Sequence, residues 1–362
     1  MEVVRTLLCI GAVSALSLVA HSDKAVKALA RQTLTLTTAK GAAILPLYLS
    51  LHGSPVDFGR AQPEVTRALI VFHGKLRNAD TYNESGIDAI RRAGEAGQGT
   101  LLITPQFLEQ VDTDTWRLPP NVLRWAPERW MAGENAINAP LSSFDAIDGI
   151  LAHLADRRLF PNLKTVVLAG HSAGGQLLQR YTVAGRGGDI LVKAGVHVRY
   201  VIANPSSYLY FSPERPVLGP RGEFTFEVPA KTCSGDYNRW KYGVLDPPPY
   251  AAEADFSALE TRYVHREVVY LLGTQDTDPN HPALDKSCSG ELEGPYRFFR
   301  GKAYFRYIQI RHPELAAESA AQQLWAVPGV DHDGDRMLNS PCGLAALFDT
   351  GACTTRILDP KP

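Results

Sequence analysis

The stretch Thr165-Val-Val-Leu-Ala-Gly-His-Ser-Ala-Gly-Gly175 joins an apolar run to a serine that lies between small residues. Residues 165–169 are apolar and β-branched enough for a buried central strand, whereas residues 173–184 place apolar side chains with the period of a helix. The chain must therefore turn sharply at Ser172, and the glycines of Gly170-His-Ser-Ala-Gly174 leave room for strand and helix to pass. Gly-x-Ser-x-Gly between a strand and a helix is a nucleophile elbow, so we interpret Ser172 as a nucleophile.

At this motif the chain resembles the α/β-hydrolase family. The resemblance implies an α/β fold with a mostly parallel central sheet, helices on both faces and a lid or cap insertion. It also implies a covalent serine hydrolase. Such an enzyme needs a base, an acid and an oxyanion hole, which the rest of the chain has to supply.

Length and composition favour one catalytic domain with a cap. The chain has 362 residues, of which 45% are hydrophobic, so it can bury a large core. We expect this domain to span residues 23–362. Residues from about 206 to 262 read as a lid, because prolines and aromatic residues interrupt the alternation of strands and helices there. A net charge of -1 gives no reason to expect nucleic acid or a charged membrane surface as a partner, and we expect a monomer.

Residues 1–22 resemble a secretory signal. Arg5 precedes an apolar run over residues 7–20, and Ala20-His-Ser22 offers a small-x-small cleavage site. An uncleaved anchor is the alternative, because Glu2 offsets the charge of Arg5. We expect a secreted or periplasmic protein without an integral membrane domain once the signal is cleaved.

Four cysteines follow the signal, and an even count in an exported chain predicts two disulfides. Three pairings are possible. Proximity in sequence favours Cys342 with Cys353, which leaves Cys233 with Cys288. A zinc site is the rival interpretation, but no cysteine pair has C-x-x-C spacing and no histidine lies near them. The sequence therefore predicts no metal site, and we expect no cofactor.

The oxyanion hole is assigned through the resemblance. Residues 69–72 form a short apolar strand that ends in His73-Gly74. In α/β-hydrolases a His-Gly after an early strand turns the backbone so that an N–H group points into the active site. By that match the two donors are the N–H groups of Ala173 and Lys75. We expect the Lys75 side chain to be solvated rather than catalytic.

The acid and the base also follow from the resemblance. The family places its acid after a late strand in a Gly-x-x-Asp context, and Gly273-Thr-Gln-Asp276 fits that pattern directly. Asp278 is the alternative acid. His332 follows the last strand, over residues 324–327, and gives the family's chain order of serine, acid and histidine. His73 is the rival base, although its place on the oxyanion turn favours a structural role.

A long stretch from Pro105 to Pro140 contains Trp116, Trp125 and Trp130. The tryptophans could form the walls of a substrate cleft, or they could anchor a long loop to the body of the protein. We favour anchoring for at least two of the three.

These assignments predict hydrolysis of a carboxylic ester through an acyl-enzyme, with a small-molecule or polymeric ester as substrate. Amide or peptide hydrolysis on the same fold is the alternative. A non-catalytic binding module is a weaker one, because such a module could lose its serine, histidine and aspartate freely.

Overall fold

The computed structural model describes residues 24–38, 41–230, 233 and 236–362. The expected signal segment lies outside these residues. The strands are β1 (Gln32–Thr38), β2 (Gly41–Leu51), β3 (Ser54–Pro55), β4 (Arg67–Phe72), β5 (Thr100–Pro105), β6 (Leu108–Glu109), β7 (Arg124–Trp125), β8 (Thr165–His171), β9 (His197–Ala203), β10 (Arg215–Leu218), β11 (Phe224–Glu227), β12 (Glu267–Gly273) and β13 (Gln322–Val327).

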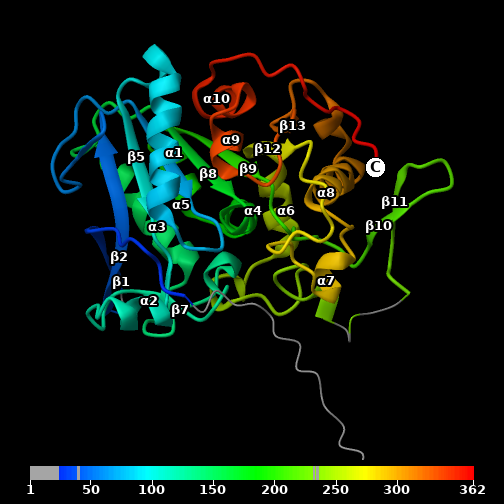
Figure 1. The fold of residues 1–362 in the computed structure, drawn as a ribbon, viewed down its shortest axis with the longest axis horizontal. Helices are drawn as coiled ribbons and strands as arrows, with labels where there is room; N and C mark the ends of the chain where they lie inside the picture. Colours follow the sequence, from blue (N-terminus) through cyan, green and yellow to red (C-terminus); the bar gives the residue numbers. More distant parts are fainter. Residues whose placement is uncertain (1–23, 39–40, 231–232, 234–235) are drawn as a thin grey trace, which may run out of the picture.

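Helices alternate with these strands over most of the chain (Figure 1). They are α1 (Ala79–Arg92), α2 (Gln110–Thr115), α3 (Ser143–Leu154), α4 (Ala173–Ala184), α5 (Gly187–Lys193), α6 (Phe256–Val264), α7 (Cys288–Glu291), α8 (Arg297–Arg311), α9 (Gly334–Leu338) and α10 (Pro341–Phe348), with 3₁₀ turns η1 (Gly94–Gly97), η2 (Trp130–Ala132), η3 (Asp236–Asn238), η4 (Pro249–Ala251) and η5 (Pro313–Ala316).

The central sheet has the strand order β1-β2-β5-β4-β8-β9-β12-β13, with β3 paired to β2. Strands β1, β2 and β3 pair antiparallel, as does β2 with β5, and all pairs from β5 to β13 are parallel. The expected fold class, a mostly parallel sheet with helices, is confirmed. Because β4, β8, β9, β12 and β13 run in one direction, the segments that leave their carboxyl ends meet at one edge.

Helices cover both faces of the sheet. Along β4, Ala68, Ile70 and Phe72 face one buried cluster with α3, α4, α5, α6 and α8, whereas Leu69 and Val71 face a second cluster with α1, α9 and α10. This alternation is the period of two expected of a strand that is buried on both faces. The larger core therefore lies on the face that α4, the helix directly after Ser172, covers.

The stretch after β5 is built from short elements, β6, α2, β7 and η2, rather than being irregular throughout. Trp125 and Trp130 are fully buried, and the Trp130 ring stacks on Phe107 with centroids 5.5 Å apart. Trp116 donates from Nε1 to the carbonyl oxygen of Val26 at 3.1 Å. The tryptophans thus anchor this stretch to the body, as favoured from the sequence.

Between β9 and α6 the chain leaves the sheet. It forms the β10–β11 hairpin, which projects from one edge of the molecule in Figure 1, and the turns η3 and η4. Helix α6 itself packs on the sheet through Tyr263 and Val264. The last residues of the expected lid, from Phe256 onward, therefore belong to the body of the domain.

Both expected disulfides are confirmed. Cys342 bonds to Cys353 with a Cα–Cα distance of 4.5 Å, and Cys233 bonds to Cys288 at 5.6 Å. The second bond joins the insertion to the start of α7. No described helix is both long and apolar enough to span a membrane.

Candidate active site

The turn at Ser172 has the backbone conformation of a sharp elbow, with φ 57° and ψ -118°. The glycines on either side are required by close backbone approach. A Cβ atom at Gly170 would lie 2.3 Å from the carbonyl oxygen of Gly174, and one at Gly174 would lie 2.4 Å from that of Phe72. The local sequence therefore forces Ser172 to the tip of the turn, at the start of α4.

Ser172, His332 and Asp276 form one hydrogen-bonded chain. His332 Nε2 lies 2.9 Å from Ser172 Oγ, and His332 Nδ1 lies 2.7 Å from Asp276 Oδ2. Because a carboxylate only accepts, Nδ1 carries the proton and Nε2 is free to accept the serine proton. All three residues come from segments that leave carboxyl ends of strands, namely β8, β12 and β13.

The alternative acid, Asp278, and the alternative base, His73, form their hydrogen bonds with other residues. The Asp278 carboxylate is exposed and accepts the Asn280 N–H at 2.8 Å. His73 is fully buried, and its ring contacts the Gly74 carbonyl at 2.9 Å and accepts the Phe107 N–H at 3.0 Å. Burial lowers the pKa of His73 to about 4, which keeps it neutral. Its role in these contacts is to shape the turn.

The expected oxyanion donors lie at the same cavity as the serine. Lys75, Ala173 and Ser172 line a cavity of about 500 Å³. Ala173 is the first residue of α4, so its N–H has no intrahelical partner. In the described part of the chain, neither the Ala173 N–H nor the Lys75 N–H donates to a protein atom. Both are thus available to a ligand.

The Lys75 side chain is partly exposed, and it forms an ion pair rather than being fully solvated. Its Nζ lies 2.5 Å from Glu128 Oε1, and both side chains are about one-third exposed. This pairing was not visible in sequence, because Glu128 belongs to a loop 53 residues away that folds back over the elbow.

Arg297 is a site residue that sequence reasoning missed. It is fully buried at the start of α8 and donates from Nη1 to Asp276 Oδ1 at 3.1 Å and from Nε to Ser206 Oγ at 2.7 Å. The next residue, Phe298, donates its N–H to the Asp276 carbonyl at 3.1 Å. The start of α8 therefore holds both the side chain and the backbone of the acid. No motif marks Arg297 in the sequence.

Asn204 braces the two loops that carry the acid and the histidine. Its Oδ1 accepts the Gly273 N–H at 2.9 Å, and its Nδ2 donates to the Asp331 carbonyl at 3.2 Å. The residue is fully buried at the end of β9. An asparagine serves both roles because its amide carries an acceptor and a donor.

His171 and Tyr82 form a wall behind His332. The Tyr82 hydroxyl lies 2.9 Å from His171 Nδ1, and the rings of His171 and His332 are 4.6 Å apart between centroids. Burial holds the pKa of His171 well below its usual range, and the charge of a protonated His332 lowers it further. His171 is therefore a neutral neighbour of the base.

Burial and charge also tune the site. Burial lowers the pKa of His332 below its ordinary value of 6.5. The hydrogen bond that His332 donates to Asp276 raises this pKa, and the charge of Arg297 lowers it further. For Asp276, burial raises the pKa, but the hydrogen bond to His332 and the charges of His332 and Arg297 outweigh it and lower the pKa overall. Near neutral pH these shifts favour a neutral imidazole beside an ionised carboxylate.

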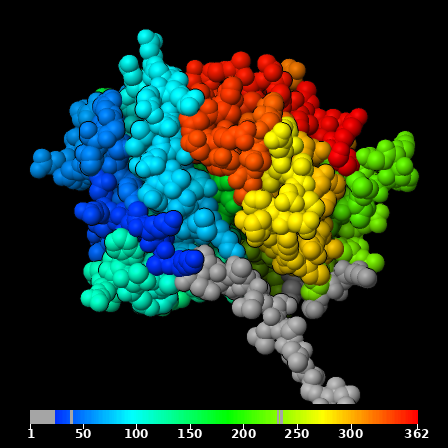
Figure 2. Space-filling model, in the orientation of Figure 1, coloured from blue at the N-terminus to red at the C-terminus, as the bar shows by residue number. Residues whose placement is uncertain are grey.

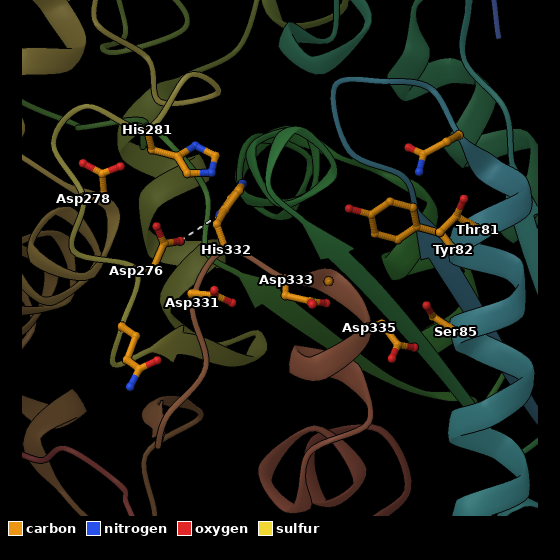
Figure 3. A pocket seen from close by; sticks show the side chains of 13 residues that line it. Thr81, Tyr82, Ser85, Asp276, Asp278, His281, Asp331, His332, Asp333 and Asp335 are labelled. Carbon is orange, nitrogen blue, oxygen red and sulfur yellow. Dashed lines mark hydrogen bonds and ion pairs between the residues drawn. The ribbon is translucent and has the colours of Figure 1, made fainter. Parts of the chain in front are cut away.

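Two cavities lie at this site, one lined by Ser172 and the other by His332. Ser172 lies on the first. The second, of about 570 Å³, is lined by His332, Asp276 and further aspartates (Figure 3). It lies between residues near 80 and residues near 280, where the face drawn in Figure 2 is hollowed. Among the described residues, no group of histidine, cysteine and acidic side chains has the arrangement of a metal site.

Solved structures resemble this chain over nearly its whole length. Poly(aspartic acid) hydrolase-1 from Sphingomonas sp. KT-1 has a TM-score of 0.56 at 23% identity, covering 88% of this chain and 98% of that one. LpqC, poly(3-hydroxybutyrate) depolymerase from Bordetella parapertussis, has a TM-score of 0.57 at 20% identity, covering 93% and 95%. No protein-family model matches the sequence, and no curated protein sequence matches it.

Proposed function

Since the chain has the α/β-hydrolase fold, we propose that it is a serine hydrolase that cleaves a carboxylic ester through an acyl-enzyme. The observation that carries the proposal is the hydrogen-bonded chain from Ser172 Oγ to His332 and on to Asp276, at 2.9 and 2.7 Å. The serine stands at the start of α4, where the helix dipole favours developing negative charge.

In the proposed reaction His332 Nε2 takes the proton of Ser172 as Oγ attacks the substrate carbonyl carbon. The N–H groups of Ala173 and Lys75 hold the oxyanion, and Asp276 stabilises the imidazolium through Nδ1–H. The tetrahedral intermediate expels the alkoxide, which leaves with the Nε2 proton. Water then attacks the acyl-enzyme, gives a proton to Nε2, and the acid leaves as Ser172 regains its proton.

We place the activity in a single catalytic domain over residues 23–362, with the insertion from 206 to about 255 contributing a cap. The insertion supplies Lys241 and Tyr242 to the cavity that holds Ser172. We also propose export to an oxidising compartment, secreted or periplasmic, because the two disulfides need one. Amino-terminal sequencing of the exported protein would show whether cleavage follows Ser22.

Active-site labelling tests the chemistry. A fluorophosphonate should modify Ser172, as located by peptide mass spectrometry, and Ser172→Ala should abolish labelling and lower kcat/KM for p-nitrophenyl esters by roughly 10⁴-fold or more. Ser319→Ala, an exposed serine far along the chain, is the matched control and should leave both unchanged. Labelling at another residue, or activity that survives Ser172→Ala, would overturn the proposal.

A substrate panel separates the ester from the amide reaction, which uses the same serine and histidine. We expect p-nitrophenyl esters to be turned over well ahead of peptidyl anilides, because p-nitrophenolate leaves more readily than an aniline. Faster cleavage of the anilides would assign amide hydrolysis instead. No labelling and no turnover of either set would favour a binding module.

A further inference from the structure

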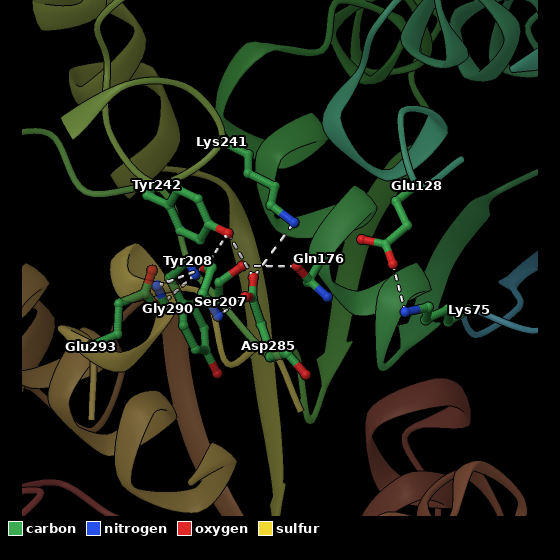
Figure 4. Close-up of polar contacts among 12 residues, drawn as sticks. Lys75, Glu128, Gln176, Ser207, Tyr208, Lys241, Tyr242, Asp285, Gly290 and Glu293 are labelled. Atoms are coloured by element: carbon green, nitrogen blue, oxygen red, sulfur yellow. Dashed lines mark hydrogen bonds and ion pairs between the residues drawn. The ribbon is translucent and has the colours of Figure 1, made fainter. Parts of the chain in front are cut away.

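The cavity that holds Ser172 is lined by more charged and polar groups than an apolar acyl pocket needs. Three lysines lie on it, Lys75, Lys241 and Lys286, with only two carboxylates, Glu128 and Asp285. Figure 4 shows Lys75, Lys241 and both carboxylates. Excess positive charge beside a nucleophile attracts anionic substrates. An amine can bind such a substrate only if other protein groups do not already hold it.

Lys241 is the amine that remains available inside the cavity. Lys75 is committed to Glu128 at 2.5 Å, and Lys286 is exposed at the rim. Lys241 Nζ, by contrast, lies 3.5 Å from Asp285 Oδ2, which is beyond a good charged hydrogen bond. Nζ also lies over the Tyr242 ring, 5.3 Å from its centroid. An ammonium has three donors, so these two loose contacts leave Lys241 with unused capacity.

Asp285 has hydrogen-bond partners besides Lys241, although the Lys241 charge does most to lower the pKa of this carboxyl against the effect of burial. Its Oδ2 accepts the Tyr242 hydroxyl at 2.8 Å, and its Oδ1 accepts the Ser287 N–H at 3.0 Å. Asp285 therefore keeps two hydrogen bonds when Lys241 turns toward another anion.

The position of Lys241 is set by the nucleophile's own helix. Arg180, fully buried on α4, donates from Nε to the Lys241 carbonyl at 2.9 Å. The same guanidinium donates to the Gln176 carbonyl at 2.9 Å and to Ser207 Oγ at 2.9 Å. Because α4 starts directly after Ser172, these bonds hold the backbone of Lys241 in a set relation to the serine.

Gln176 adds a second donor to the same cavity. Its Oε1 accepts the Ser207 hydroxyl at 2.8 Å, which orients the amide. The Nε2 group then points away from Ser207 (Figure 4), and no described residue accepts a hydrogen bond from it. An ammonium and an amide N–H on one wall are suited to the two oxygens of a carboxylate.

The cavity lined by His332 has the opposite polarity. Asp278, Asp331, Asp333 and Asp335 line it (Figure 3). A substrate carboxylate is repelled there and attracted toward Lys241, so the two cavities together would orient an anionic substrate across the serine.

We propose that Lys241 and Gln176 form a carboxylate-binding subsite, and that the preferred substrates are acyl compounds bearing a free carboxylate, such as half-esters of dicarboxylic acids. This inference rests on the proposed serine hydrolysis and specifies its substrate class.

A matched pair of esters tests the subsite. Monoethyl glutarate and ethyl pentanoate have acyl chains of equal length and differ in the terminal carboxylate, and ethanol release measures both. We expect the wild-type ratio of kcat/KM to favour the glutarate ester, and Lys241→Met to lower that ratio by about 10-fold or more. Gln176→Glu, which keeps the acceptor for Ser207 but brings a like charge, should lower it as well.

Two further variants complete the design. Lys241→Arg keeps the charge and should retain most of the ratio, and Lys193→Met, on an exposed position of α5, should leave it unchanged. A ratio that stays constant in Lys241→Met while Ser172 still labels with fluorophosphonate overturns the subsite and leaves the proposed hydrolysis standing. No turnover of either ester together with no labelling overturns the hydrolysis, and the subsite with it.

A binding measurement does not depend on turnover. Calorimetric titration of the Ser172→Ala protein with monoethyl glutarate should give a dissociation constant that rises about 10-fold in the Ser172→Ala, Lys241→Met double variant and also rises with added salt. Equal affinities in the two proteins would contradict the proposal.

Discussion

Arg297 and Asp276 form a buried ion pair on the side of the carboxylate that faces away from His332. Arg297 Nη1 donates to Asp276 Oδ1 at 3.1 Å, while His332 Nδ1 contacts Oδ2 at 2.7 Å. Both oxygens of the Asp276 carboxylate therefore have a partner. The positive charge of Arg297 is separated from His332 only by this carboxylate. This relationship affects the pH dependence of the reaction.

Removing the charge of Arg297 should move the acid limb of the pH profile. Activity needs neutral His332, whose pKa lies below 6.5, so wild-type kcat/KM should fall only below pH 6.5. Arg297 lowers that pKa by charge repulsion, so its loss stabilises the imidazolium and raises the pKa. In Arg297→Gln the limb should shift to higher pH, together with a lower kcat from a less ordered Asp276.

The conservative variant separates charge from structure. Arg297→Lys keeps the positive charge, so its acid limb should stay near that of the wild type even if kcat falls. Circular dichroism would show that both variants fold. A limb at the same pH in all three proteins would mean that Arg297 only supports the structure.

Gly174→Ala should disrupt the elbow. The new Cβ atom would lie 2.4 Å from the Phe72 carbonyl oxygen, and backbone on β4 cannot move without disturbing the sheet. We expect a loss of about 1–3 kcal/mol in the free energy of unfolding, by urea denaturation, and a large loss of kcat. Gly59→Ala is the control, since its Cβ would meet only the movable Asp57 carboxylate at 3.3 Å. Equal stability of the two variants would refute the close approach.

Asn204 should be sensitive to both of its hydrogen bonds. Asn204→Ala leaves the Gly273 N–H without its acceptor, at a cost of about 1–3 kcal/mol in unfolding free energy, and loosens the loops that carry Asp276 and His332. Asn204→Asp keeps that acceptor but loses the donor to the Asp331 carbonyl. The aspartate variant should therefore fall between the wild type and the alanine variant in kcat, whereas equal kcat in all three would exclude a bracing role.

The bond between Cys342 and Cys353 should stabilise the carboxyl-terminal segment. It closes a short loop with a sequence separation of 11 residues, and removing it with Cys342→Ser plus Cys353→Ser should cost about 2–4 kcal/mol. The thermal midpoint should fall correspondingly. Adding a reductant should lower the midpoint of the wild type more than that of the double variant, which has already lost this bond. An unchanged midpoint in the double variant would contradict the prediction.

The sequence alone predicts the elbow and a mostly parallel sheet, from the glycines at 170 and 174 and from hydrophobic period. The chain order of Ser172, Asp276 and His332 came from the resemblance to α/β-hydrolases, and it is consistent with parallel strands that bring their carboxyl ends to one edge. The disulfide pairing also followed from proximity along the chain.

Tertiary structure alone decides which side chains meet across that edge. Asp276 rather than Asp278 reaches His332, because the loop after β12 is held by the bonds from Thr274 N–H to Val327 and from Gln275 N–H to Val330. Arg297, Glu128 and Lys241 lie far from the serine in sequence, and each reaches the site only through a loop path or a helix start that no local pattern encodes. Local rules set where the backbone turns, whereas direction and burial of a side chain depend on every element packed around it.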